Sequence, residues 1–378
     1  MMVFAMSQMI HHQISDLAGI LKKRHSPSLY LVVDQTAFQQ TGLDQILEPL
    51  FQNYPTFRFH QFTPNPDLAE LETAVASYRQ TMPDTIIAIG GGTALDLGKL
   101  VSLFGQQSEP CRELVLHPPS SMNDPANLIA IPTTAGTGSE ATHFAVIYID
   151  TMKYSVADPR MLPSHVILDP KLTRTMPATL TADTGLDAFC QAVESMWSIQ
   201  STEASRQYAQ QAITLAWKHL PPAVLDPTSQ ARAGMCQAAH LSGKAINISR
   251  TTAPHALSYA FTSLYAIPHG RAVALTLPLF FRAACHMTAE TCLDPRGVRH
   301  VASILSQITN LLGCDTPDQV PETLERFIES LGCPTSLQQI GITNDQQLEQ
   351  VITRINFERV ANYPVKLDQR ELKELFMS

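Results

Sequence analysis

Three short runs of aliphatic and β-branched residues constrain the fold of this chain more than any other feature. They are LYLVV at residues 29–33, TIIAI at residues 85–89 and NLIAI at residues 127–131. Residues 67–80 space apolar side chains at helical intervals after Asp67, a typical helix N-cap residue. Strands that are almost continuously apolar and are separated by helices belong to a parallel sheet covered on both faces. The first part of the chain therefore predicts a doubly wound α/β domain.

The sequence pattern changes after a predicted β-hairpin at residues 143–159 and a last predicted strand, HVILDP, at residues 165–170. Beyond about Thr179 the chain has long helical patterns, as at residues 202–220 and 231–247, and no convincing strand. We therefore predict an α/β domain with a parallel sheet, followed by an all-α domain. The boundary is expected near residue 173, which divides the chain into residues 1–173 and 174–378.

Charge and composition limit the classes of partner. The 378 residues include 26 Lys and Arg against 34 Asp and Glu, a formal net charge of −8. Such a chain offers a polyanion no attractive field, so we expect no nucleic-acid partner. Apolar residues make up 44% of the chain and charged residues 16%, against about 25% charged in typical domains. This composition excludes intrinsic disorder.

The cysteines and the N-terminus indicate the compartment. The seven cysteines are scattered and form no C-x-x-C pair, so they indicate neither a disulfide framework nor a zinc ribbon. The N-terminal stretch lacks the features of a signal peptide, and the sequence has no run of about 18 apolar residues. We therefore expect a cytoplasmic protein that does not bind a membrane.

Two loops of small residues follow neighbouring predicted strands. GGGTALDLGK at residues 90–99 opens a helix, an arrangement in which backbone N–H groups can hold a pyrophosphate. It departs from the dinucleotide fingerprint G-x-G-x-x-G because its sixth residue is Leu95, and a plain tight turn would also use glycine. PTTAGTGSE at residues 132–140 follows the next strand. Two such loops at one edge of a sheet predict a ligand crevice.

Asp34 ends the first predicted strand. A carboxylate at that place accepts hydrogen bonds from an adenosine ribose and repels a 2′-phosphate, which favours NAD(H) over NADP(H). An Asp at the same place also opens a turn or caps the next helix. Both interpretations remain open from the sequence.

The helical half contains side chains of the types that bind metals. Asp187 and Gln191 stand four residues apart, hence on one helix face. His255 and His269 stand fourteen residues apart, and Pro268 suits the first turn of a new helix. Two imidazoles and a carboxylate around an open position describe a catalytic divalent-metal site. A single helical His, taken alone, is more often an ordinary surface or core residue.

Together these motifs resemble those of the iron-containing (group III) alcohol dehydrogenases, from about Leu29 to the C-terminus. GGGTALDLGK is similar to that family's GGGS-x-x-D-x-x-K loop, PTTAGTGSE to its second loop, and IPHG with an upstream His to its metal-binding stretch. The resemblance implies an NAD(P)-dependent oxidoreductase with a dinucleotide-binding α/β domain and a helical metal-binding domain.

The resemblance also implies roles for individual residues. The residues expected to bind the cofactor are Asp34, Gly90, Gly91, Gly92, Thr93, Asp96, Thr133, Thr134, Ser139 and Lys153. Four residues occupy the metal-ligand positions: Asp187, Gln191, His255 and His269. Fe²⁺ is the expected metal and Zn²⁺ the alternative.

Two positions depart from the family pattern. Gln191 stands where the usual ligand is His, and its neutral carbonyl oxygen is a weaker donor to a transition metal than imidazole. Tyr259 stands where many members have another His near the nicotinamide. We predict that Tyr259, or water linked to the metal, delivers the proton to the product.

The segment SRTTAPHALSY at residues 249–259 bears on the substrate. It resembles the branch of the family that reduces phosphonoacetaldehyde to 2-hydroxyethylphosphonate. Independently, Arg250, Thr251 and Thr252 lead into the helix that carries His255, and an Arg, two hydroxyls and a helix N-terminus together suit a phosphonate or carboxylate. Alternatively a Thr only caps the helix and Arg250 makes a surface ion pair. Other candidates for binding the anion are Lys153, Lys244 and Arg271.

The predicted function is metal-dependent reduction of a small anionic aldehyde to a primary alcohol by NAD(P)H. One alternative is a general short-chain alcohol, hydroxybutyrate or glycerol dehydrogenase on the same scaffold. The altered ligand at Gln191 raises another, a catalytically inactive nucleotide-binding homologue. We expect a homodimer or a larger assembly.

Overall fold

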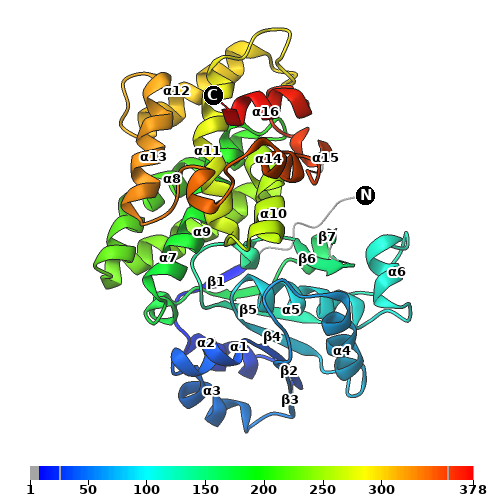
Figure 1. The fold of residues 1–378 in the computed structure, drawn as a ribbon. Helices are drawn as coiled ribbons and strands as arrows, with labels where there is room; N and C mark the ends of the chain where they lie inside the picture. Colours follow the sequence, from blue (N-terminus) through cyan, green and yellow to red (C-terminus); the bar gives the residue numbers. More distant parts are fainter. Residues whose placement is uncertain (1–7, 25–26, 151, 356, 378) are drawn as a thin grey trace. The chain divides into compact units, whose positions relative to one another are not determined.

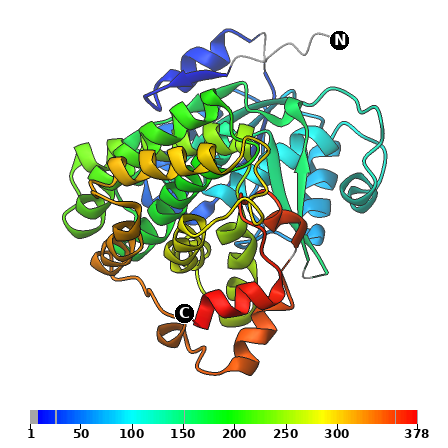
Figure 2. The same ribbon diagram turned by 90° about the horizontal axis from the view of Figure 1, so that it is seen from above.

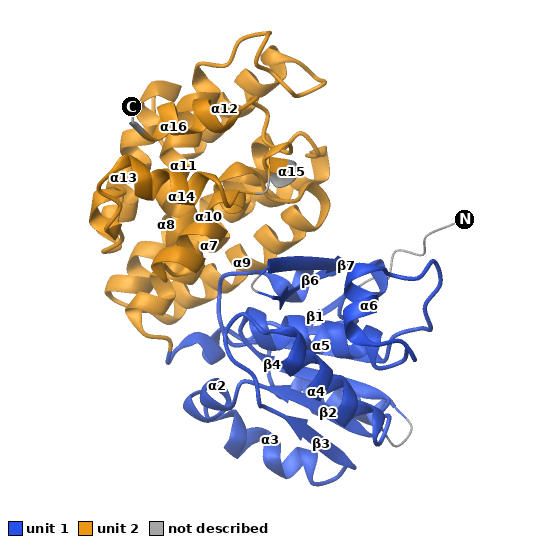
Figure 3. Cartoon of the chain, turned by 45° about the vertical axis from the view of Figure 1, so that its right-hand side comes forward, with its two compact units in different colours: residues 1–175 blue, residues 176–378 orange. Residues whose placement is uncertain are grey.

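The computed structural model describes residues 8–24, 27–150, 152–355 and 357–377. The chain divides into two compact units, residues 1–175 and residues 176–378 (Figure 3). The division lies two residues from the predicted boundary. Within the described ranges, no helix is both long and apolar enough to span a membrane.

A six-stranded parallel sheet, in the order β1-β8-β5-β4-β2-β3, forms the centre of the first unit (Figure 1). Its strands are β1 Met9–His11, β2 Leu29–Val33, β3 Thr56–Phe59, β4 Thr85–Gly90, β5 Asn127–Pro132 and β8 His165–Ile167. The three strands expected from their apolar runs are confirmed as β2, β4 and β5. The sequence analysis missed β1 and β3, because β1 has three residues and β3 exposes Phe57 in a mixed run.

Helices cover both faces of this sheet, as the apolar strands predicted. Leu31 of β2 and Ile87 of β4 belong to the buried cluster formed with α1 Asp16–Lys22, α2 Gln35–Gln40 and α3 Leu43–Phe51. On the opposite face, the Tyr30 hydroxyl donates to the carbonyl of Ala74 at 2.8 Å, in α4 Leu68–Arg79. Beside it, α5 Gly92–Phe104 approaches so closely that a Cβ on Gly98 would lie 2.6 Å from the Ala88 Cβ.

The remaining elements of the first unit are short. The predicted hairpin is confirmed as the antiparallel pair β6 Phe144–Ile149 and β7 Met152–Ala157. The other elements are α6 Cys111–Leu116 and the 3₁₀ helices Ser139–Ala141, Pro159–Met161 and Pro170–Thr173.

The described part of the second unit contains helices and no strand, which agrees with the predicted all-α region. Its α-helices are α7 Ala178–Trp197, α8 Glu203–Leu225, α9 Ser229–Ser249, α10 Ala253–Tyr265, α11 His269–Cys285, α12 Val298–Leu311, α13 Val320–Ser330, α14 Asp345–Ile352, α15 Phe357–Val360 and α16 Gln369–Met377. Two 3₁₀ helices are Pro317–Gln319 and Gln338–Ile340.

Helices α7, α8 and α9 pack along one another (green in Figure 2). Small buried side chains, such as Ala212 and Ala216 of α8 and Ala238 of α9, suit close packing. Helix α8 runs five residues beyond the predicted end at Leu220, through two prolines close to its C-terminus.

Candidate active site

The loop between β4 and α5 brings backbone N–H groups to the carboxyl edge of the sheet. Gly90 has φ 151°, and a Cβ there would lie 2.7 Å from the Ala94 Cβ and 2.8 Å from the Asp34 Cβ, so only glycine fits. Gly91 is the N-cap residue of α5, which places Gly92 and Thr93 in the first turn of that helix. N–H groups in a first turn have no partner within the helix and attract anions.

The loop after β5 lies against the first loop. A Cβ on Gly92 would lie 2.9 Å from the Thr137 Cγ2, and one on Gly91 would lie 3.4 Å from the Thr134 Cγ2. Thr133 is buried, and its Oγ1 has no hydrogen-bond partner within the described chain. A buried hydroxyl without a partner is costly, and a bound ligand would satisfy it. The structure thus brings the two predicted loops together, and the Thr133 hydroxyl is a group that a bound ligand could satisfy.

Asp96 connects the two loops and the hairpin. Its Oδ1 accepts a hydrogen bond from the Ser139 Oγ at 2.5 Å, and its Oδ2 accepts one from the Val146 N–H at 2.9 Å. The fully buried Lys99 donates to the Ser139 Oγ at 2.7 Å, to the Thr142 Oγ1 and to the Phe144 carbonyl. Burial lowers the pKa of Lys99, an effect that Asp96 and Glu140 oppose. The contacts of Asp96 thus join its loop to Ser139 and to the hairpin, and Lys99, which was not predicted from the sequence, supports the same place.

Asp34 and Lys153 occupy different places relative to the loops. Asp34 is the N-cap residue of α2, where its Oδ1 accepts from the Ala37 N–H at 3.0 Å. The cap uses one carboxylate oxygen, and the side chain lies beside Gly90. Lys153 lies on β7 in register with Tyr148 rather than on either loop.

Three side chains from α7, α10 and α11 converge in the second unit. The His255 Nε2 lies 3.2 Å from the Asp187 Oδ1, and the His269 Nε2 lies 3.7 Å from the same oxygen. One ligand atom from each of the three residues lies within 4.8 Å of the others. Asp187 and His255 are buried. Two imidazoles and a carboxylate at these distances suit a divalent transition metal.

Two further residues orient the imidazoles, and the sequence analysis missed both. The fully buried Glu194 accepts from the His255 Nδ1, so that Nε2 faces Asp187. The Ser258 hydroxyl donates to the His255 carbonyl at 2.8 Å and lies 3.1 Å from the His269 Nδ1. Because its one hydrogen is already used, Ser258 accepts from the His269 Nδ1–H, so that a neutral His269 carries its lone pair on Nε2. Such outer partners fix the tautomer of metal-binding histidines.

The charges around His255 also suit a cation. Burial lowers the pKa of His255, but the Glu194 and Asp187 carboxylates outweigh burial and raise it to about 10. Two buried carboxylates are costly without a positive charge between them. A divalent metal supplies such a charge in exchange for the proton.

The neighbours of Asp187 show how α7 and α11 come so close. A Cβ on Gly270 would lie 1.9 Å from the Asp183 carbonyl oxygen and 2.9 Å from the Asp187 Cβ. The glycine of the IPHG motif therefore lets the start of α11 rest on α7. Pro268 is the N-cap residue of α11 and lies one position before the predicted first turn.

Gln191 and Tyr259 flank this cluster. Gln191 is buried one turn after Asp187, and its Oε1 accepts from the Ser242 Oγ at 2.9 Å. A carbonyl oxygen has a second lone pair, so its role as a ligand stays a prediction. The Tyr259 ring stacks on the His269 ring, with centroids 5.5 Å apart and planes at 2°.

Arg250 lies in an unusual turn between α9 and α10. Its backbone has φ 60° and ψ 174°, a region that residues with a Cβ rarely adopt. The side chain is partly buried, and this burial lowers the pKa of Arg250. Thr251 follows with its backbone carbonyl accepting from Asn362 at 2.9 Å.

Thr252 does not have the substrate-binding role that was expected from the sequence. It is the N-cap residue of α10 but makes no side-chain cap. Its N–H and its hydroxyl both donate to the Glu194 Oε2, at 2.6 and 2.8 Å, and the Trp197 Nε1 donates to that hydroxyl. The donors of Thr252 therefore bind a protein carboxylate, which leaves Arg250 and Thr251 as the candidates for a substrate anion.

Comparison with known proteins identifies the family of this chain. The model of the iron-containing alcohol dehydrogenase family matches residues 8–170, and that of the C-terminal part of Fe-containing alcohol dehydrogenases matches residues 181–378. The chain is 31% identical over 375 residues to phosphonoacetaldehyde reductase of Streptomyces viridochromogenes, covering 96% of this chain and 93% of that protein. It is 32% identical to long-chain-alcohol dehydrogenase 1 of Geobacillus thermodenitrificans, covering 85% and 81%.

Solved structures share the fold. Sulfoacetaldehyde reductase from Bifidobacterium kashiwanohense in complex with NAD⁺ superposes with a TM-score of 0.86 at 27% identity, covering 98% of this chain and 96% of that chain. A 1,3-propanediol oxidoreductase gives a TM-score of 0.84 at 26% identity, covering 98% and 97%. The protein thus belongs to the iron-containing alcohol dehydrogenase family and is an NAD(P)-dependent oxidoreductase.

Proposed function

We propose that this enzyme reduces a small aldehyde with an anionic group, phosphonoacetaldehyde in particular, to the primary alcohol. The observation that carries the proposal is the partly buried Arg250, held in a strained turn five residues before His255. A guanidinium in such a place binds a phosphonate or sulfonate through charge-assisted hydrogen bonds. The phosphonoacetaldehyde and sulfoacetaldehyde reductases among the relatives act on aldehydes of this kind.

The metal-ligand roles are part of this proposal. Asp187, His255 and His269 hold the ion, with Gln191 as a neutral fourth ligand, and Fe²⁺ is favoured over Zn²⁺. When bound, a divalent metal acts as a Lewis acid on the aldehyde oxygen while NADH provides the hydride. Glu194 and Ser258 keep both Nε2 atoms directed at the ion through their contacts with the Nδ1 atoms.

The remaining residues bind the cofactor and move the proton. The N–H groups of Gly91, Gly92 and Thr93 hold the pyrophosphate, and Thr133 and Thr134 contact the nicotinamide half. Asp34 selects NADH, because its carboxylate repels a 2′-phosphate. Tyr259 gives the proton from its phenol. These roles assign the first unit to the dinucleotide and the second to the metal.

The assembly is proposed to be a homodimer or larger, as expected from the resemblance. Size-exclusion chromatography with light scattering checks this directly. A monomeric mass at working concentrations would contradict it.

Arg250→Ala tests the proposed substrate class. A charge-assisted hydrogen bond to a partly desolvated anion contributes roughly 1.5–3 kcal/mol, or about ten- to hundredfold in kcat/KM. We expect that loss for phosphonoacetaldehyde and a far smaller loss for propanal, which has no anion to bind. Equal losses would mean that Arg250 supports the fold. If neither substrate is affected, the anion is bound elsewhere, and Lys153, Lys244 and Arg271 are the next residues to replace.

A further inference from the structure

The Arg250 turn is under backbone strain that its own sequence does not explain. A helix usually ends with glycine where the backbone takes positive φ, because a side chain there is unfavourable. Arg250 has φ 60° and ψ 174°, so it lies outside even the small left-handed helical region. Strain of this kind persists only where the surroundings impose it.

Asn362 binds the backbone on both sides of this strained residue. Its Nδ2 donates to the Ser249 carbonyl and to the Thr251 carbonyl, each at 2.9 Å. An amide has two N–H donors, and the two carbonyls that they meet belong to the residues immediately before and after Arg250. The side chain of Asn362 therefore fixes the distance and the direction between the two neighbours of Arg250.

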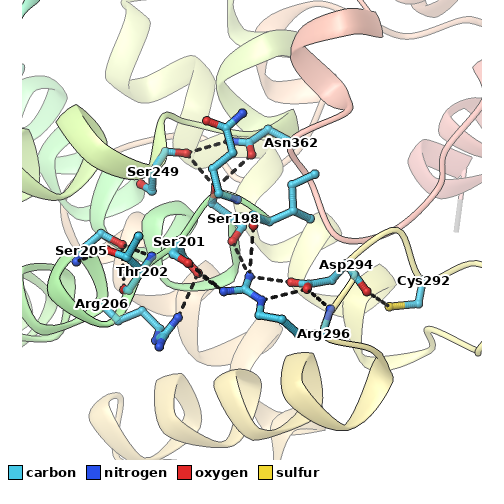
Figure 4. Close-up of polar contacts among 12 residues, drawn as sticks. Ser198, Ser201, Thr202, Ser205, Arg206, Ser249, Cys292, Asp294, Arg296 and Asn362 are labelled. Atoms are coloured by element: carbon cyan, nitrogen blue, oxygen red, sulfur yellow. Dashed lines mark hydrogen bonds and ion pairs between the residues drawn. The ribbon is translucent and has the colours of Figure 1, made fainter. Parts of the chain in front are cut away.

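Asn362 is itself held in place by buried contacts. Its Oδ1 lies 3.0 Å from the Ser198 Oγ, and its backbone carbonyl accepts from the Ile199 N–H at 3.1 Å (Figure 4). Ser198 is fully buried and also lies 2.8 Å from the Ser249 carbonyl. Arg296 in turn donates to the carbonyls of Ser198 and Ser201, at 3.0 and 2.7 Å. The segment after α7 thus holds the Asn362 amide through several hydrogen bonds.

We propose that Asn362 is a positioning residue for the substrate anion, because its amide holds the Arg250 backbone in the strained conformation from which the guanidinium reaches the substrate. This inference rests on the proposed function and extends it to a residue 112 positions farther along the chain. Asn362 acts through the backbone of Arg250 and is not a catalytic residue. Because Asn362 already restricts the backbone of Arg250 in the free enzyme, Arg250 loses less conformational entropy when it binds the anion.

The experiment compares Asn362→Ala, Arg250→Ala and the double variant with phosphonoacetaldehyde and propanal. For Asn362→Ala we expect KM for phosphonoacetaldehyde to rise about tenfold with kcat nearly unchanged, and kcat/KM for propanal to stay within about twofold. In the Arg250→Ala background the same change should add less than about twofold, since the two residues act as one unit. Asn310→Ala, at an exposed position of α12, is the matched control.

Each result has a defined meaning. Selective losses in both single variants without additivity support the inference. Suppose that Arg250→Ala loses activity only on phosphonoacetaldehyde, whereas Asn362→Ala loses activity equally on both substrates or on neither. This result overturns the inference about Asn362 and leaves the proposed function intact. An unselective Arg250→Ala overturns the proposed function and this inference with it.

Melting temperature gives a test that does not depend on activity. Arg250→Gly should melt a few degrees above Arg250→Ala, because glycine adopts φ 60° and ψ 174° without strain. This difference should disappear in the Asn362→Ala background if Asn362 imposes the conformation. The control is Ala266→Gly, at another positive φ of 53°, whose effect should be the same in both backgrounds. A glycine advantage that survives Asn362→Ala would contradict the inference.

Discussion

The loop after β4 and the turn before α10 both hold backbone at positive φ, but they do so with different residues. In the first, Gly90 takes φ 151° with no side chain to oppose it. In the second, Arg250 takes φ 60°, and the carbonyls of its two neighbours accept hydrogen bonds from Asn362, far along the chain. The comparison indicates two kinds of site. The loops proposed to bind the nucleotide are built from contiguous backbone, whereas the region proposed to bind the metal and the anion is built from side chains of several helices.

The largest expected effect comes from the side-chain region. His255→Ala or His269→Ala removes a proposed metal ligand, and we expect this to cost several kcal/mol of transition-state stabilisation, about a thousandfold or more in kcat/KM. NADH binding, measured by fluorescence titration, should stay near the wild-type value. Exposed His286 offers the control variant His286→Ala. Full activity of wild type after chelator treatment would contradict the assignment.

The backbone-built loop is tested next by Gly90→Ala. The added Cβ would meet Ala94 and Asp34 at under 3 Å and would strain the backbone, at a cost of about 1–3 kcal/mol. We expect a lower melting temperature and about a tenfold or greater loss of NADH affinity. Gly42→Ala is the control, because Gly42 has φ 71° but open space around it. Equal effects of the two substitutions on NADH binding would remove the special role of the β4 loop.

Glu194→Gln tests whether the side-chain region depends on its outer partners. The change keeps the side-chain volume but removes the negative charge of a carboxylate that accepts hydrogen bonds from both His255 and Thr252. Such partners usually contribute about ten- to hundredfold in metal affinity, which competition with a chromogenic chelator measures. The control Glu349→Gln alters an exposed Glu of α14. Unchanged metal affinity in Glu194→Gln would show that the imidazoles need no such support.

The smallest expected effect concerns Asp34, one of few side chains in the backbone-built site. Asp34→Gly should lower the preference for NADH over NADPH by several-fold, because like-charge repulsion is lost. It also removes the side-chain cap of α2, at a cost of only about 0.2–0.5 kcal/mol of stability, because glycine is itself tolerated at an N-cap. Asp67→Gly is the matched control, since Asp67 caps α4 in the same way. If both variants keep the wild-type ratio of kcat/KM values, Asp34 is only a cap.

The same contrast explains what could be predicted from sequence. Strands β2, β4 and β5 and their glycine loops were predictable because each signal lies within about ten residues. The hydrogen bonds of Glu194 to Thr252 and of Asn362 to Ser249 span 58 and 113 residues. No local pattern marks such pairs, so Glu194, Ser258 and Asn362 were missed. The expected substrate contact of Thr252 depended on position alone, and the structure directs its donors to Glu194.

The central claim, that this enzyme reduces an anionic aldehyde, is tested most directly by steady-state kinetics of the metal-loaded wild type. Phosphonoacetaldehyde, succinic semialdehyde and propanal are compared at matched concentrations with NADH. We predict the highest kcat/KM for phosphonoacetaldehyde and the lowest for propanal, which lacks an anionic group. A higher kcat/KM for propanal would contradict the account and favour a general alcohol dehydrogenase, and no turnover of any substrate would favour an inactive homologue.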